Sequence, residues 1–93
     1  MIGKFCVVRC KDAAVHCGIV AGINGRTVLI HNARKLWQWK GANTVNEVAL
    51  HGVDEEFTRL SEPVDAILVL DACEVIPCTE KAQANLSRSR WGQ

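Results

Sequence analysis

The dipeptide Asn24-Gly25 constrains the fold of this chain more than any other feature of its sequence. It separates two apolar runs with strand-like composition, residues 16–23 and 26–31. A two-residue type I′ turn needs positive φ at both central positions, and asparagine followed by glycine adopts this conformation readily. The sequence therefore predicts an antiparallel hairpin at this point.

Three further segments carry strand patterns. Residues 5–9 are almost continuously apolar, which is typical of a strand buried on both faces and therefore central in its sheet. Residues 57–60 predict a short strand that Pro63 ends. Residues 64–77 predict either one long strand or two strands with a bend near Asp71.

Two segments carry helix signals. Thr44 and Glu47 match the capping box at the start of residues 44–52, and Gly52 suits the position just after a helix. Apolar residues of this segment recur at helical spacing: Val45, Val48 and Ala49. Thr79 is placed to cap a second short helix over residues 80–85.

These elements predict a mainly β, α+β fold: a small antiparallel sheet, sandwich or barrel-like, with one or two short helices. Ninety-three residues suffice for one domain, 1–93, with a modest core, and oligomerisation often aids domains of this size. Residues 86–93 have no periodicity and are predicted to form an extended C-terminal tail. Trp91 in this tail is expected to insert into its own subunit or a neighbour.

The charge balance argues against two classes of partner. Eleven basic and ten acidic residues are distributed along the chain, whereas nucleic-acid binding needs a concentrated basic surface. No apolar run approaches the roughly 18–20 residues needed to span a bilayer. The first four residues do not resemble a secretory signal, so we expect a protein made in the cytoplasm, with no membrane partner.

Five cysteines is a high number for this length: Cys6, Cys10, Cys17, Cys73 and Cys78. Their count is odd and no two have C-x-x-C spacing. In a reducing cytosol they are expected to remain thiols that pack as small apolar side chains. A disulfide formed later, outside the cell, and a zinc site with the three histidines are the alternatives.

Residues 32–42 hold two of the three tryptophans and are predicted to form a strand that ends at Gly41. Alternation places Lys35, Trp37 and Trp39 on one face. The other face carries Arg34, Leu36, Gln38 and Lys40. The two rings could cover the core or an oligomer seam. They could also stack on a nucleobase, with Arg34 or Lys40 near a phosphate.

Signatures of common catalytic sites are absent from the sequence. There is no phosphate-binding glycine loop and no G-x-S-x-G elbow. His16 and Cys17 are adjacent, so a strand sends them to opposite faces, while a pairing of Cys10 with His31 stays open. We therefore expect no enzymatic activity, no cofactor and no metal site.

Several stretches together resemble small proteins of tailed phages and prophages, a group described as a domain of unknown function. These are residues 32–42 (NARKLWQWKGA), the helix over 44–52, residues 74–82 (EVIPCTEKA) and Trp91. Gln38 stands where that pattern commonly has an aromatic residue. Cys6, Cys17 and Cys73 look like additions of this sequence, and Cys10 with Cys78 is the candidate disulfide pair.

The resemblance implies a phage origin without an assigned chemistry. Two functions fit a small, nearly neutral, β-rich phage protein. The first is a virion structural component, a capsid decoration or tail accessory protein, located in the host cytoplasm and then in the virion. It would form a dimer or trimer and contact other virion proteins. The alternative is a sponge that sequesters a small nucleotide signal of host anti-phage defence.

Overall fold

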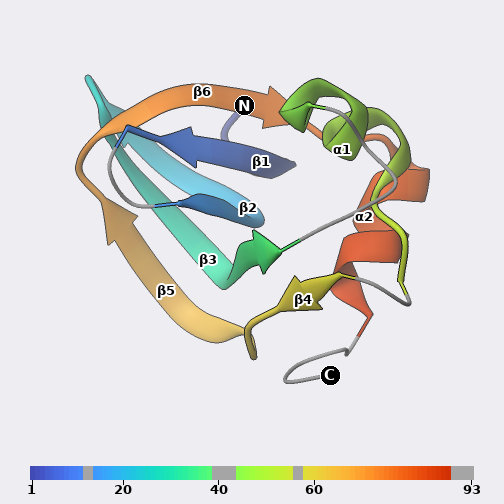
Figure 1. The fold of residues 1–93 in the computed structure, drawn as a ribbon. Coiled ribbons are helices and arrows are strands. Elements are labelled where there is room, and N and C mark those ends of the chain that lie inside the picture. The colour runs from blue at the N-terminus through green and yellow to red at the C-terminus, as the bar shows by residue number, and fades with distance from the viewer. Residues whose placement is uncertain (12–13, 39–43, 56–57, 89–93) are drawn as a thin grey trace.

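Six antiparallel strands form one open, strongly curled sheet, and two short helices pack beside each other at one end of it (Figure 1). The computed structural model describes residues 1–11, 14–38, 44–55 and 58–88. The elements are β1 (Phe5–Cys10), β2 (Val15–Asn24), β3 (Thr27–Gln38), α1 (Val45–His51), β4 (Arg59–Leu60), β5 (Val64–Val69), β6 (Ala72–Pro77) and α2 (Glu80–Ser87). The predicted mainly β, α+β fold is confirmed.

The strand order is β4-β3-β2-β1-β6, and β5 also pairs with β3. β3 is long enough to pair with β5 along its first half and with β4 near its end. The sequence indicated two separate strands there, and the structure joins them into one. β5 and β6 lie at opposite edges of the sheet, yet the chain passes from one directly into the other at the left of Figure 1. The sheet therefore curls until its two edges approach each other at that end.

The predicted hairpin is present, but its turn lies one residue later than the sequence indicated. Asn24 pairs with Thr27 across the two strands, so the loop residues are Gly25 and Arg26. Gly25 has a φ of 62°, whereas Asn24 and Arg26 are not among the residues with positive φ. Glycine at the first central position with positive φ only there is typical of a type II′ turn, which replaces the predicted type I′ turn.

A bulge in the middle of β3 determines which of its side chains face the helices. Cys17 pairs with Arg34 and Ile19 with His31, so β3 has one residue more than β2 in this interval. Asn32 takes up the extra residue with a φ of 50°. Bulges of this kind bend a strand and redirect the side chains that follow. Gly18 of β2 lies opposite this bulge, where the backbones of β2 and β3 are very close.

Two apolar clusters pack on opposite faces of the sheet. The inner cluster fills the curled sheet: Cys6, Val8, Cys10, Val20, Val28, Ile30, Ala33, Val69 and Ala72. The outer cluster lies between the sheet and the helices: Val7, Val15, Cys17, Leu36, Val48, Ala49, Val53, Leu60 and Leu86. β1 contributes to both clusters and lies between β2 and β6, which confirms its predicted central position. Burial on both faces explains its nearly continuous apolar sequence.

The helix signals are confirmed with one change of boundary. Thr44 caps α1 through a complete capping box with Glu47, and Thr79 caps α2. α2 continues to Ser87, so the predicted extended tail cannot begin at residue 86. Asn85 ties α2 to the end of α1, because its side chain accepts from the Val53 amide and donates to the Val53 carbonyl, each at 2.9 Å. No helix in the described parts of the chain is long and apolar enough to cross a membrane.

Candidate functional site

Arg34 is the most deeply buried charged side chain among the described residues, with 5% of its surface exposed. The β3 bulge turns it toward α2, where it joins three parts of the chain. Nε donates to the Ser61 carbonyl at 2.8 Å, and Nη1 donates to the Leu86 carbonyl at 3.1 Å and to the Arg88 carbonyl. The guanidinium therefore fixes the end of α2 and the segment after β4 to the sheet.

The positive charge of Arg34 is not matched by a carboxylate in the described residues. The ion pairs found there join Arg9 to Glu74 and Arg88 to Glu55. All three known acceptors of the Arg34 guanidinium are neutral carbonyls, and Nη2 is buried without a hydrogen-bond partner in the described structure. Burial lowers the pKa of Arg34, which reflects the cost of keeping this charge away from water.

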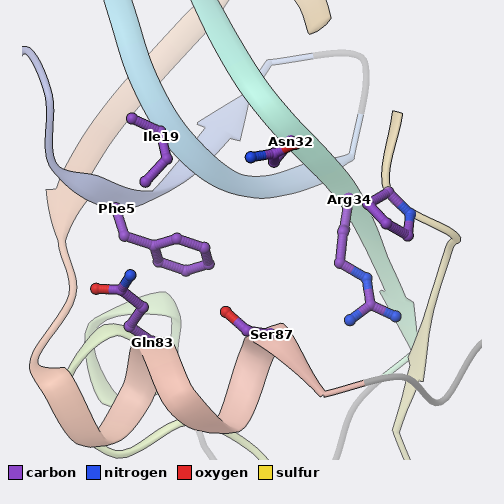
Figure 2. A pocket seen from close by; sticks show the side chains of 7 residues that line it. Phe5, Ile19, Asn32, Arg34, Gln83 and Ser87 are labelled. Atoms are coloured by element: carbon purple, nitrogen blue, oxygen red, sulfur yellow. The ribbon is translucent and has the colours of Figure 1, made fainter. Parts of the chain in front are cut away.

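A hollow of about 290 Å³ lies beside Arg34, between the sheet and α2. Its walls come from β1, β2, β3, α2 and the residue before β5: Phe5, Ile19, Asn32, Arg34, Pro63, Gln83 and Ser87. Figure 2 shows the Phe5 ring above Gln83 and Ser87 of α2, with Arg34 at the other end of the hollow. An apolar ring, neutral polar groups and one cation thus surround a space of small-ligand size.

Trp37 lies on the face of β3 opposite Arg34. Its side chain is 52% exposed, and the Arg59 guanidinium lies 5.7 Å from the ring centroid, within cation–π range. Trp37 therefore does not cover the core, although it remains available for an oligomer seam. Of the predicted combinations of Trp37 or Trp39 with Arg34 or Lys40, the pair Trp37 and Arg34 does not share one face of β3. Trp39, Lys40 and Trp91, the other predicted contact residues, lie outside the described residues.

Cys10 approaches His16, with Sγ and Nδ1 3.8 Å apart, in place of the pairing with His31 that the sequence left open. Both side chains are buried. Burial and the nearby Asp71 carboxylate raise the pKa of Cys10 to about 11, and burial lowers the pKa of His16. The thiol is therefore protonated and the imidazole neutral at pH 7, so the two side chains do not form a thiolate–imidazolium pair.

The candidate disulfide between Cys10 and Cys78 does not fit within one chain of this fold. Cys10 pairs with Ala72 at the start of β6, whereas Cys78 follows Pro77 at its end. Six positions of extended chain, roughly 20 Å, separate Ala72 from Cys78, and a disulfide needs Cα atoms within about 7 Å. No disulfide joins any of the five cysteines in the structure, and Cys73 is the one that is exposed. The described residues contain no cluster of three or more metal ligands.

The outer face of β5 exposes apolar side chains that neither helix covers. Val64 is 47% exposed, Leu68 57% and Leu70 68%. Leu68 lies directly opposite Leu29 of β3, so the apolar surface continues onto the next strand. The other edge of β5 has no hydrogen-bonded neighbour strand among the described residues. An apolar face beside an open strand edge favours contact with another protein chain.

Sequence reasoning found some of these features and missed others. Alternation had placed Arg34 on the same face as Leu36, and the burial of Leu36 is the signal that Arg34 would be buried too. The hollow could not be found in this way, because Phe5 and Gln83 are 78 positions apart and neither belongs to a local motif. Only the packing of α2 against the sheet brings them together.

Comparison with known proteins shows the family of the chain. A search of curated proteins and a search of solved structures each found no match. The model of a family described as a domain of unknown function, DUF6948, matches residues 3–86. This range includes every strand, α1 and all but the last residue of α2. The phage origin stays a prediction, because the family description does not address it. By the extent of this match, the chain belongs to the DUF6948 family.

Proposed function

We propose that the protein is a non-catalytic phage accessory protein that assembles with copies of itself as a structural component of the virion. The observation that carries the proposal is the unpaired edge of β5 beside the exposed side chains of Val64, Leu68 and Leu70. A strand edge with free backbone groups and an apolar face is a ready template for pairing with a second chain.

The sequence of β5 leaves this edge without the usual protection. Soluble proteins commonly place lysines, prolines or bulges on exposed edge strands to prevent pairing. β5 contains no lysine and no proline, and its pairing with β3 is regular from Ile67 to Val69. Its one charged residue is Asp65. The edge is therefore open to hydrogen bonding in solution.

A twofold axis through β5 makes the edge complementary to itself. In an antiparallel pair centred on Ala66, Val64 of one copy lies opposite Leu68 of the other, on the outer face. Asp65 then lies opposite Ile67, so the two acidic side chains do not face each other directly. The two sheets become one continuous sheet, and their exposed apolar faces join. Trp37 offers a second exposed anchor for neighbours in a larger assembly.

A charge placed on β5 tests the assembly. Leu68→Lys puts a positive charge on the outer face of the edge strand, and we expect it to shift sedimentation velocity profiles to the monomer. Leu50→Lys is the matched control, because Leu50 is 51% exposed on α1, away from β5. Equal oligomerisation of the two variants would contradict the use of this edge.

The virion role needs a second measurement. Quantitative mass spectrometry of particles from a phage that encodes the chain should find many copies per particle. Samples with and without reductant show in addition whether the exposed Cys73 forms links between copies. Complete absence of the chain from the particles would contradict the structural role while leaving self-assembly untouched.

The alternative function, sequestration of a small nucleotide signal, cannot use Trp37 and Arg34 together. Trp37 and Arg34 lie on opposite faces of β3, so one nucleotide cannot contact both. A nucleotide that binds at the hollow would have to use Phe5 and the polar groups of α2 instead. Assembly through β5 uses the exposed apolar side chains and the open strand edge, which nucleotide binding leaves without a role.

A further inference from the structure

The hollow beside Arg34 has the features of a binding site that assembly does not use. We infer that it binds a small molecule with one carboxylate on a flat apolar body. This inference does not depend on the proposed structural role, because the hollow lies between the sheet and α2, whereas the assembly surface is the outer face of β5.

Arg34 carries a buried charge that no described group of opposite charge balances. Only 5% of the surface of Arg34 is exposed, and its hydrogen bonds go to neutral carbonyls. A buried charge is costly unless a group of opposite charge compensates it. No described carboxylate does so, and Nη2 still lacks an acceptor. A carboxylate in the hollow would place the missing negative charge beside the Arg34 side chain that lines it.

The shape and composition of the walls suit a small, flat molecule. About 290 Å³ lies at the small end of the range for ligand pockets, which suits one or two fused rings. The Phe5 ring and the Ile19 side chain form the apolar part. Gln83 and Ser87 offer neutral hydrogen-bonding groups for a polar substituent. This combination fits an aromatic or similarly flat carboxylate.

The basic groups on the walls limit the charge of the ligand. Arg34 is the one basic residue among the described residues that line the hollow. A single buried cation matches the single charge of a carboxylate, whereas a phosphate monoester carries up to two charges at neutral pH and is commonly held by several donors. The site therefore favours a monocarboxylate over a nucleotide or free phosphate.

Titration of the full chain with benzoate and 2-naphthoate, followed by amide NMR shifts, tests the inference. We expect saturable binding of one molecule per chain, with the largest shifts around Phe5, Asn32 and Gln83. Benzamide has the shape of benzoate without its charge and should bind at least about tenfold more weakly, as expected for the loss of the attraction between the carboxylate and the guanidinium. Absence of binding by both carboxylates, or equal affinity for benzamide, would overturn the inference. Tighter binding of adenosine monophosphate or inorganic phosphate would overturn the choice of a carboxylate.

A pair of variants on α2 locates the site without disturbing Arg34. Gln83→Glu places a negative charge on the wall of the hollow and should weaken carboxylate binding by roughly tenfold through repulsion. Ala84→Glu adds the same charge to the next exposed position of α2, which does not line the hollow, and should leave the affinity nearly unchanged. Circular dichroism checks that both variants fold. Equal affinity of the two variants would place the ligand elsewhere.

Discussion

Arg34→Met should be one of the most destabilising single substitutions in this protein. Methionine keeps much of the length and apolar stem of arginine but donates none of the hydrogen bonds to the Ser61, Leu86 and Arg88 carbonyls. With about 1 kcal/mol of net stabilisation for each bond, the free energy of unfolding should fall by about 3 kcal/mol. Hydrogen bonds from a charged donor can contribute more than this to stability. The substitution also removes the cost of burying the guanidinium, and this offsets part of the larger contribution. This loss is a large share of the ~5–15 kcal/mol typical of small domains.

Urea unfolding followed by circular dichroism measures this change. Arg59→Met is the matched control, because Arg59 is half-buried and its described contact is with the Trp37 ring, so its loss should cost about 1 kcal/mol or less. Arg34→Lys keeps the charge but replaces the planar group with one ammonium, and its stability should lie between those of the wild type and Arg34→Met. A free energy of unfolding for Arg34→Met within about 0.5 kcal/mol of that for Arg59→Met would refute the role of Arg34 as the tie between α2 and the sheet.

Three further predictions concern the core and the thiols. Gly18→Ala should destabilise the fold by roughly 1–3 kcal/mol in the same urea assay, because the new Cβ would lie 2.6 Å from Ile30 Cγ2. Gly22→Ala is the control and should be tolerated, because the atom nearest to its new Cβ lies 3.9 Å away. His16 has a lowered pKa in the folded protein, so the unfolded chain takes up a proton first as the pH falls. The free energy of unfolding should therefore decrease below about pH 6.5, with a contribution from His16 of up to about 1.4 kcal/mol per pH unit. His16→Gln should make this dependence on pH less steep. An unchanged dependence in the variant would contradict the lowered pKa of His16. In native protein, a disulfide reagent should modify one thiol rapidly, and Cys73→Ser should remove that fast phase; a fast phase that persists would contradict the exposure of Cys73.

The sequence predicted those parts of the fold that depend on local patterns. The capping box of Thr44 and Glu47 predicted α1, and the apolar run of β1 predicted a strand covered on both faces. The turn type was wrong because the strand pairing extends one residue further than the composition indicates, which moves Asn24 into the ladder. Local propensity cannot fix such a boundary when neighbouring residues suit either position.

The candidate site was less accessible from the sequence, because it depends on tertiary packing. Asn32 introduces the bulge that redirects β3, and no period-2 pattern anticipates one extra residue in a strand. The exposed face of β5 reads in the sequence as an ordinary apolar strand, since Leu68 and Val69 look alike until the sheet places one outside and one inside. Burial of Arg34 follows from α2 docking on this region, which links residues more than fifty positions apart.

Sedimentation of the wild-type chain over a range of concentrations tests the proposed assembly most directly. The weight-average mass should rise with concentration from the 10.2 kDa of one chain to a whole multiple of that value. Amide hydrogen exchange should slow in the β5 segment as the mass rises, because the open edge becomes paired. A mass of 10.2 kDa at every concentration, with unchanged exchange in β5, would contradict assembly through this strand.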